Sequence, residues 1–334
     1  YALLMNLNLW GNTEARGCSF DEATMTWNVE LKLADGSTRV MHPKHVVLAV
    51  GGVGGRPRIP ELPGLKEFKG DVKHSSAFAS GAPYTGKKVM VVGASTTAHD
   101  ICLDLAMRGA DTMMAQRGAT CVVNISEVLA FGADYARVSG DEADMLRSAM
   151  PYPLWIKRAK VYTEGTEKSH KELHDGLRRA GQRLTIGHDD TGWSIKLFRE
   201  AAGYYLNVGA SEAIVDGRIK MQDYDEIDKF VPQGALLKDG SIIELDAVIL
   251  CTGYYDLEND IAALLGDDIA KKVGRCNGVD PEYGEYRTMS RPTAQPHLWL
   301  INGGIPDSRK SSDHLAMQVI AQMEKAGYVD LYRQ

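Results

Sequence analysis

The first part of the chain carries an apolar pattern that ends in a glycine. Residues 25–36 alternate in the manner of a β-strand and close on Asp35-Gly36, a dipeptide typical of a hairpin turn. A return strand follows, and the apolar run over 45–49 leads to Gly51. A strand that ends at glycine lets a ligand approach the backbone closely, so the pattern indicates a ligand-facing strand end.

The same order recurs near residue 240. A strand, an Asp239-Gly240 turn and a return strand lead to a second apolar run over 247–250, which is followed by Gly253. Two unrelated hairpins are the simpler interpretation. The matching order of turn, strand and glycine instead favours two copies of one nucleotide-binding half.

Between the two copies lies a strand–turn–helix pattern. Residues 88–94 form a short β-branched run that ends in glycine, residues 96–108 have helical character, and residues 111–116 form a second short strand. Together with the duplicated meanders, this βαβ opening predicts an α/β protein. We expect two dinucleotide-binding domains, each Rossmann-like and built in three layers.

Only the second copy is preceded by a phosphate-binding loop in this sequence. That loop is at Gly93, upstream of the Asp239 turn. If the first copy had a loop at the same distance before its Asp35 turn, that loop would fall before Tyr1. We therefore expect the first domain to be incomplete in this chain. Its unpaired sheet edge would invite pairing with another chain, so a homodimer is one expected state.

A chain of 334 residues suggests two domains. We predict part of the first domain and a connector at 1–80, a nucleotide-binding domain at 81–245, and a return to the first domain at 246–334. A helical and loop insertion is predicted at about 120–210. Its many aromatic residues indicate either an extra packing layer or a lining for a substrate.

Composition narrows the class of function. The net charge of −6 disfavours nucleic acid as a partner, because phosphate binding needs a basic surface. No apolar run is long enough to indicate a membrane span. The five cysteines form no CxxC pair, which argues against dithiol chemistry and indicates a reduced, cytoplasmic protein.

The turn that opens the central βαβ unit has the layout of a dinucleotide fingerprint. Gly93 would make a tight surface turn, and the small side chain of Ala98 would let helix and strand pack closely. Ser95 stands where a glycine is usual, and Thr96 and Thr97 complete the loop. The N-terminus of the helix would face a pyrophosphate with free N–H groups and the positive end of its dipole.

Arg117 indicates which nucleotide binds. It follows the second strand of the unit, where an NAD-specific site usually carries an acid that accepts from the ribose 2′-hydroxyl. The strand ends in Gln116-Arg117-Gly118 without an acid, and a guanidinium there suits a 2′-phosphate. A solvated arginine at a strand end is the alternative interpretation.

Phe68, Gly70, His74 and Phe78 have the spacing F-x-G-x-x-x-H-x-x-x-F, just before the central βαβ unit. With this motif the chain resembles the flavin-containing monooxygenase family. The related Baeyer–Villiger enzymes carry tryptophan at the last position, so Phe78 favours the branch that oxygenates nitrogen and sulfur. The resemblance implies that this segment crosses between an FAD domain and an NADP domain, where His74 orders the linker or senses NADP.

Further segments extend the resemblance in the same order along the chain. Residues 58–70 are similar to the family's connector, and residues 251–254 to its ATGY motif, with Cys in place of Ala. Residues 299–322 are similar to its terminal glycine turn and helix beside the flavin. In the family, the ATGY motif marks the return from the NADP domain to the FAD domain.

The resemblance implies FAD and NADPH as cofactors, with Gly51, Thr252 and Gly253 on the FAD side and the Gly93 loop and Arg117 on the NADP side. It implies a monooxygenase that inserts one oxygen atom from O₂ into a small soft nitrogen or sulfur nucleophile. No Ser-His-Asp or paired-carboxylate constellation is evident, so the catalytic residues are unknown.

Two alternatives remain open. One is a flavoprotein NADPH reductase, and the other is a nucleotide-binding module without catalysis. Because the first phosphate loop is missing, we expect this chain alone to be colourless and inactive.

His170 and His174 are spaced as in a helical zinc pair. The glutamate between them is misplaced for an HExxH motif, and no third ligand is evident. Nearby lysines and arginines indicate a solvated helix face, so we expect no metal here.

Overall fold

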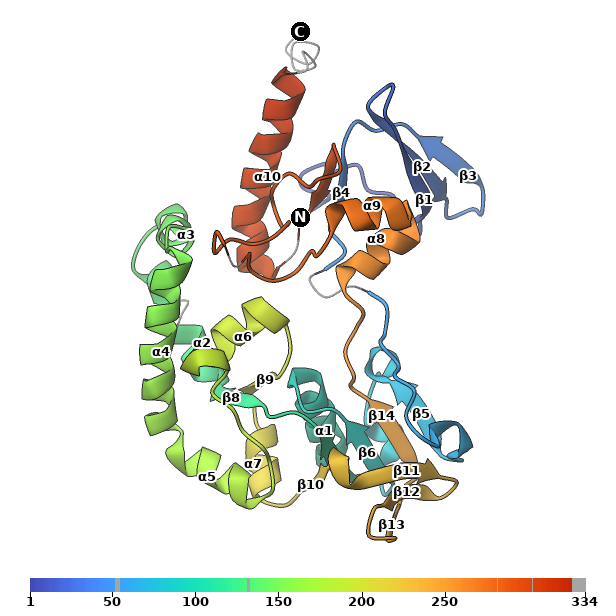
Figure 1. Ribbon diagram of the computed structural model, residues 1–334, viewed down its shortest axis with the longest axis vertical. Coiled ribbons are helices and arrows are strands. Elements are labelled where there is room, and N and C mark those ends of the chain that lie inside the picture. The colour runs from blue at the N-terminus through green and yellow to red at the C-terminus, as the bar shows by residue number, and fades with distance from the viewer. Residues whose placement is uncertain (52–54, 131–132, 281, 302, 326–334) are drawn as a thin grey trace. The chain divides into compact units, whose positions relative to one another are not determined.

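The computed structural model describes most of the chain (Figure 1). The described residues are 1–51, 55–130, 133–280, 282–301 and 303–325. The chain divides into two compact units. Unit 1 comprises Tyr1–Arg56, Tyr254–Asp280 and Tyr286–Gln334, and unit 2 comprises Pro57–Gly253 and Pro281–Glu285.

Five parallel strands form the central sheet of unit 2, in the order β10-β7-β6-β14-β5. Their bounds in chain order are β5 (Asp71–His74), β6 (Lys88–Val92), β7 (Asp111–Gln116), β10 (Ile219–Asp223) and β14 (Ala247–Leu250). The main segment of unit 2 therefore runs from Pro57 to Gly253. The sequence had predicted narrower limits for the nucleotide-binding domain, at 81–245. The difference arises because β5 and β14 both pair within this sheet.

Three layers make up the sheet region of unit 2, as expected. Val89 and Val91 of β6 pack into the same core as Leu105 of helix α1 (Thr96–Met107), whereas Met90 and Val92 pack into a core with Phe230. A strand that is apolar on both faces is typical of a parallel sheet covered on both sides. One cover is formed by α1 and α7 (Ala210–Val215), and the other by the antiparallel meander β11 (Ile227–Val231), β12 (Gly234–Leu237) and β13 (Ile242–Glu244) (Figure 1).

Unit 1 contains a second meander and a short parallel pair. The meander is β1 (Glu14–Asp21), β2 (Thr26–Lys32) and β3 (Thr38–Met41), and the pair is β4 (Val46–Leu48) with β15 (Leu298–Leu300). Its helices are α8 (Leu257–Leu265), α9 (Asp267–Val273) and α10 (Ile305–Lys325). Fully buried Trp27 lies in the core of this unit with Ile261 and Leu298.

The two meanders have matching turns, whereas the duplication of a nucleotide-binding half stays a prediction. In the first meander, Asp35 Oδ1 accepts from the amide and the hydroxyl of Ser37 at 2.9 and 2.6 Å. In the second, Asp239 Oδ1 accepts from the amide and the hydroxyl of Ser241 at the same two distances. The glycines inside these turns have φ of 87° and 86°, a region that favours glycine.

The predicted insertion begins and ends in a parallel pair of strands, β8 (Cys121–Asn124) and β9 (Tyr204–Asn207). Between them lie α2 (Ile125–Ala130), α3 (Gly140–Ser148), α4 (Tyr152–Ser169), α5 (Lys171–Arg179) and α6 (Gly192–Glu200). The rings of Trp155 and Phe198 meet edge to face with centroids 4.2 Å apart, which joins α4 to α6. This contact supports a packing role for the aromatic residues, and a lining for a substrate stays a prediction.

Gly93 is enclosed by the neighbouring strand and does not lie in an open surface turn as expected. Its φ is 134°, and a Cβ added there would overlap the carbonyl oxygen of Cys251. Its amide donates to the carbonyl oxygen of Ala115 at 3.0 Å. The close approach of the chain after β14 therefore requires glycine here, whether or not a ligand is bound.

Gly93→Val should lower the unfolding free energy of unit 2 by about 3 kcal/mol, because the side chain overlaps backbone and φ is unfavourable. Gly118, which lies shortly after β7, provides a control. No atom lies within 4 Å of a Cβ added there, so Gly118→Ala should be nearly neutral. Thermal unfolding followed by circular dichroism measures both. An unchanged melting temperature for Gly93→Val would show that the strands separate easily.

Candidate dinucleotide site

The turn between β6 and α1 lies at the carboxyl end of the middle strand of the sheet. From β6 the chain continues to β7 and β10 on one side and later returns on the other side as β14. In open α/β sheets, ligands bind beyond the carboxyl ends of the strands at the point where the strand order reverses. The fold therefore places the predicted phosphate loop at this point.

The hydroxyl groups of the loop point to the start of β9. Ser95 and Thr96 both donate to the carbonyl oxygen of Tyr204 at 3.1 Å, and Ser95 Oγ accepts from the amide of Gly203 at 3.2 Å. The first turn of α1 contains no acid, and its leading N–H groups have no partner within the helix. The side chains of the loop thus hold the insertion, while the backbone offers donors for an anion.

Ala98 and Thr97 differ in burial within the first turn of α1. Ala98 is fully buried in the core that α1 shares with β6, so a small residue permits the close packing of helix and strand. Thr97 is exposed. Of the loop residues, Thr97 therefore has the side chain most accessible to a ligand.

A histidine that sequence reasoning missed lies beneath the loop. His99 is fully buried, and its ring stacks on Tyr205 with centroids 4.0 Å apart. Nδ1 lies 3.0 Å from the carbonyl oxygen of Ser95, so Nδ1 carries the proton, and Nε2 accepts from the side-chain amide of Gln182 at 2.9 Å. Burial lowers the pKa of His99 to about 4, so the ring is neutral at pH 7 and fixes the Ser95 carbonyl.

Arg117 is exposed and follows the end of β7. Burial raises the pKa of Tyr224, and the nearby charge of Arg117 opposes that shift. Arg117 thus lies at the strand end where a 2′-phosphate is expected, and its charge acts on Tyr224 in the turn that follows β10.

The end of β7 at Gln116 is fixed by a residue 67 positions further along the chain. The buried side chain of Gln116 donates to the carbonyl oxygen of Arg183 at 2.9 Å and accepts from its amide at 2.8 Å. In return, the guanidinium of Arg183 donates to the carbonyl oxygens of Gln116, at 2.8 Å, and of Arg117. A glutamine directly after the apolar run over 113–115 was the sequence signal for this clamp.

Three residues of the F-x-G-x-x-x-H-x-x-x-F motif shape the connector and the edge strand β5. Phe68 is buried against Phe230 of the meander, with ring centroids 6.4 Å apart. A Cβ added at Gly70 would overlap the carbonyl oxygen of Asp246, which precedes β14. Phe78 packs against the core that contains α1.

His74 belongs to a set of hydrogen bonds that joins the beginning of unit 2, at Arg58, to the end of its main segment, at Gly253. Its Nδ1 accepts from the amide of Ser76 at 3.1 Å, so Nε2 carries the proton and donates to the carbonyl oxygen of Gly253 at 2.9 Å. The amide of Arg58 donates to the same carbonyl oxygen, and the hydroxyl of Thr252 donates to the carbonyl oxygen of Arg58 at 2.6 Å. These contacts are those of a residue that orders the linker. A role in sensing NADP stays a prediction.

The residues predicted for the FAD side fall in both units. Thr252 and Gly253 end the second segment of unit 2, and Gly51 follows β4 in unit 1. Because β4 and β15 are parallel, Gly51 and Gly303 both follow the carboxyl ends of adjacent strands, and their φ values are 94° and 117°. Unit 1 therefore presents two glycine turns at one sheet edge, where backbone can approach a ligand closely.

The histidine pair of the insertion is buried and does not lie on the solvated face that was expected. The amide of Asn124 donates to His170 Nε2 at 3.0 Å, and His174 Nε2 donates to the carbonyl oxygen of Val122 at 3.0 Å. Both rings thus hold β8 against the helices. Over the described ranges, no three His, Cys, Asp or Glu side chains are grouped so as to hold a metal.

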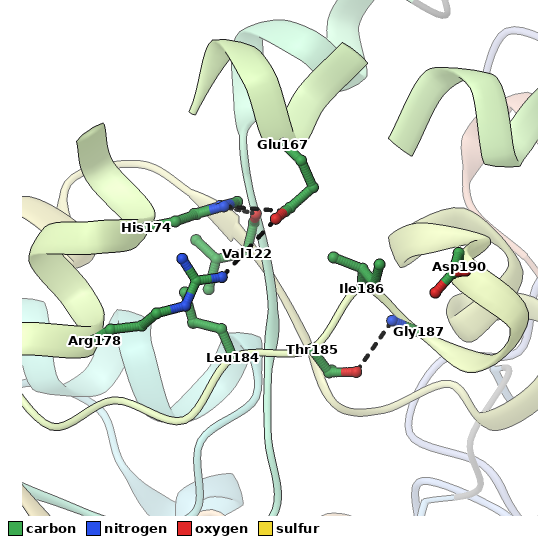
Figure 2. A pocket seen from close by; sticks show the side chains of 9 residues that line it. All are labelled: Val122, Glu167, His174, Arg178, Leu184, Thr185, Ile186, Gly187 and Asp190. Atoms are coloured by element: carbon green, nitrogen blue, oxygen red, sulfur yellow. Dashed lines mark hydrogen bonds and ion pairs between the residues drawn. The ribbon is translucent and has the colours of Figure 1, made fainter. Parts of the chain in front are cut away.

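A pocket of about 440 Å³ lies beside His174 (Figure 2). Glu167 and Arg178 point toward one another across its polar end, 3.9 Å apart, and Glu167 Oε1 lies 3.0 Å from His174 Nδ1. On the opposite wall the hydroxyl of Thr185 accepts from the amide of Gly187 at 3.1 Å. Glu167 pairs with Arg178, and Thr185 pairs with Gly187, so much of the polar lining of this pocket is already engaged.

The cysteines offer no redox pair or nucleophile. All five are free thiols. Burial raises the pKa of Cys121, Cys251 and Cys276 to about 12, so these thiols stay protonated at neutral pH. Across the residues that the structure places, no helix combines the length and the apolar composition needed to cross a bilayer.

Residues 21–259 match the model of the flavin-binding monooxygenase-like family, and the chain belongs to that family. It is 29% identical over 256 residues to the probable indole-3-pyruvate monooxygenase YUCCA4 of Arabidopsis thaliana, which covers 76% of this chain and 56% of that protein. It is also 29% identical over 240 residues to the indole-3-pyruvate monooxygenase YUCCA1 of Oryza sativa subsp. japonica, with 71% and 52% covered. The chain thus spans about half the length of these relatives.

Solved structures confirm the fold. The open crystal structure of cyclohexanone monooxygenase superimposes with a TM-score of 0.63 at 16% identity, over 94% of this chain and 68% of that one. A flavin monooxygenase variant from Stenotrophomonas maltophilia superimposes with a TM-score of 0.56 at 18% identity, over 96% and 74%. The predicted α/β, Rossmann-like architecture and the resemblance read from the motifs are both confirmed.

Acidification should destabilise unit 2 through His99. The pKa is about 4 in the folded protein and about 6.5 in an unfolded chain, so between these values the unfolded state binds more protons. His99 therefore contributes roughly 3 kcal/mol to the free energy of unfolding. This contribution is fully present above pH 6.5 and is lost as the pH falls toward 4. Urea denaturation between pH 7 and pH 4.5 should show this slope.

His99→Gln should flatten the slope, because glutamine can still donate to the Ser95 carbonyl but does not titrate. His42→Gln removes an exposed histidine and serves as the matched control. Equal slopes for His99→Gln and the unchanged chain would rule out His99 as the source.

Proposed function

We propose that the protein uses NADPH and FAD to insert one oxygen atom of O₂ into a small-molecule substrate. Membership of the flavin-binding monooxygenase-like family supports the reaction class. The single observation that supports NADPH is the exposed guanidinium of Arg117 at the end of β7, beside the β6–α1 turn. The flavin, when bound, supplies the oxygen chemistry, and the chain supplies binding and orientation.

The residues of this chain fit the two cofactors unequally. Backbone donors at the start of α1 and the guanidinium of Arg117 suit the pyrophosphate and the 2′-phosphate of NADPH. For FAD, the described residues of unit 1 offer the glycine turns at Gly51 and Gly303. In unit 2 the Thr252 hydroxyl and the Gly253 carbonyl oxygen both hold the linker, so the proposal that Thr252 and Gly253 face FAD rests on the family motif.

Two substrate classes have support. Phe78 in the motif favours a soft nitrogen or sulfur nucleophile, as in the family branch that the motif resembles. The names of the relatives, which are indole-3-pyruvate monooxygenases, favour a 2-oxo acid instead. We place the nitrogen or sulfur nucleophile first and the 2-oxo acid second. The five free cysteines support a reducing, cytoplasmic location.

Arg117→Ala should weaken NADPH binding and leave NADH binding nearly unchanged. A charge-assisted hydrogen bond contributes about 1.5–3 kcal/mol, or roughly 10- to 150-fold in affinity. Arg218→Ala removes an exposed arginine paired with Asp216 and provides the matched control. Calorimetric titration of both nucleotides measures the ratio. Equal affinities for NADPH and NADH in the unchanged chain would refute the proposed nucleotide.

Substrate oxygenation should be coupled to NADPH oxidation when FAD is supplied. Parallel assays would offer a tertiary amine, a thioether and an aromatic 2-oxo acid, and record NADPH oxidation, O₂ uptake and ¹⁸O in the product. Incorporation into the amine or the thioether supports the first class, and incorporation into the 2-oxo acid supports the second. NADPH oxidation without ¹⁸O in any product would identify a reductase.

A further inference from the structure

Two acids lie beside the strand end at which we place the 2′-phosphate. Strand β10 runs parallel to β7, with Asp223 opposite Gln116. Asp225 lies in the short turn that follows, and its amide donates to Asp223 Oδ1 at 2.9 Å. NAD-specific sites use a carboxylate at such a strand end to accept from the ribose 2′-hydroxyl. Here the carboxylates come from the neighbouring strand, and the sequence around Arg117 gave no sign of them.

Arg183 occupies both carboxylates. Its Nη2 lies 3.2 Å from Asp223 Oδ1, and its Nη1 lies 3.4 Å from Asp225 Oδ2. The same guanidinium donates to the backbone carbonyl oxygens of Gln116 and Arg117. Because the backbone of Arg183 is also held by the Gln116 side chain, its guanidinium is kept at this strand end.

We propose that Arg183 is a positioning residue that sets nucleotide specificity. It pairs with both Asp223 and Asp225, offsets one of their two negative charges, and thereby leaves Arg117 for a 2′-phosphate. The inference rests on the proposed NADPH site and goes beyond it, because it assigns the preference to a charge balance among four side chains. Arg183 itself need not contact the nucleotide.

Removal of the Arg183 charge has three consequences that act in one direction. The two carboxylates repel a 2′-phosphate, since like charges at short range oppose binding. Arg117 gains an acidic partner that competes with the phosphate. Asp223 becomes available to a ribose 2′-hydroxyl, which favours NADH. The preference for NADPH therefore falls, and the affinity for NADH is kept or rises.

The test is a titration of the full chain with NADPH and with NADH. The variants are Arg183→Ala, Arg183→Gln, which keeps a donor for the carbonyl oxygens without the charge, and the triple variant Arg183→Ala/Asp223→Asn/Asp225→Asn. Arg218→Ala is the control for loss of one surface charge. Both single variants at Arg183 should lower the NADPH-to-NADH affinity ratio about tenfold or more. The triple variant should return it to within about threefold of the unchanged chain, and Arg218→Ala should leave it unchanged.

Four results would overturn the inference. Equal loss of both nucleotides in Arg183→Gln would show a structural role only. An unrestored ratio in the triple variant would show that Arg183 binds the phosphate itself. An unchanged ratio in the Arg183 variants, while Arg117→Ala abolishes the preference, would refute the role of Arg183 but keep the proposed function. No NADPH preference in the unchanged chain would refute both.

Discussion

The close approach of the Cys251 carbonyl to Gly93 is the contact on which two parts of unit 2 depend: the turn between β6 and α1, and the segment that follows β14. It joins the carboxyl ends of β6 and β14, the two strands between which the order of the sheet reverses. On the β6 side, the contact fixes where α1 begins and so where its N-terminal amides point. On the β14 side, the chain continues directly to Thr252 and Gly253, which His74 and Arg58 hold. One backbone contact therefore positions the phosphate loop and the exit from the unit together.

The second constraint is the need to cover both faces of a short parallel sheet. Helices cover one face, and a three-stranded meander covers the other, so β6 is apolar at every position from Val89 to Val92. The meander packs closely, since a Cβ added at Gly234 would overlap the carbonyl oxygen of Ile243, and one at Gly64 would overlap that of Phe230. The connector is thereby fixed to the meander, and the motif that begins at Phe68 is part of the packing of the unit.

The features that the sequence predicted correctly are those with local signals. The Asp-Gly turns, the buried runs and the βαβ opening each lie within a few residues and recur or alternate. The predicted domain boundaries differ from the limits of the compact units because Asp71–His74 reads as polar and joins the sheet only through its pairing with β14. His170 and His174 were misread because charged neighbours suggested solvent, whereas β8 covers one side of their helices. The clamp of Gln116 on Arg183 spans 67 residues, and no periodicity reveals such a contact.

Nucleotide selectivity also depends on residues that are distant in the sequence, here through their charges. Specificity is a difference between two affinities, and it depends on every charge near the discriminating group. At the end of β7, a single arginine in the sequence suggested a phosphate site, yet the fold adds the carboxylates of Asp223 at the end of β10 and of Asp225 in the turn that follows, and a second arginine from the segment after α5. The four charges sum to zero, so the selectivity of the site depends on which arginine the carboxylates hold. The residue that follows the second strand is thus an incomplete guide to the nucleotide when a neighbouring strand brings acids of its own.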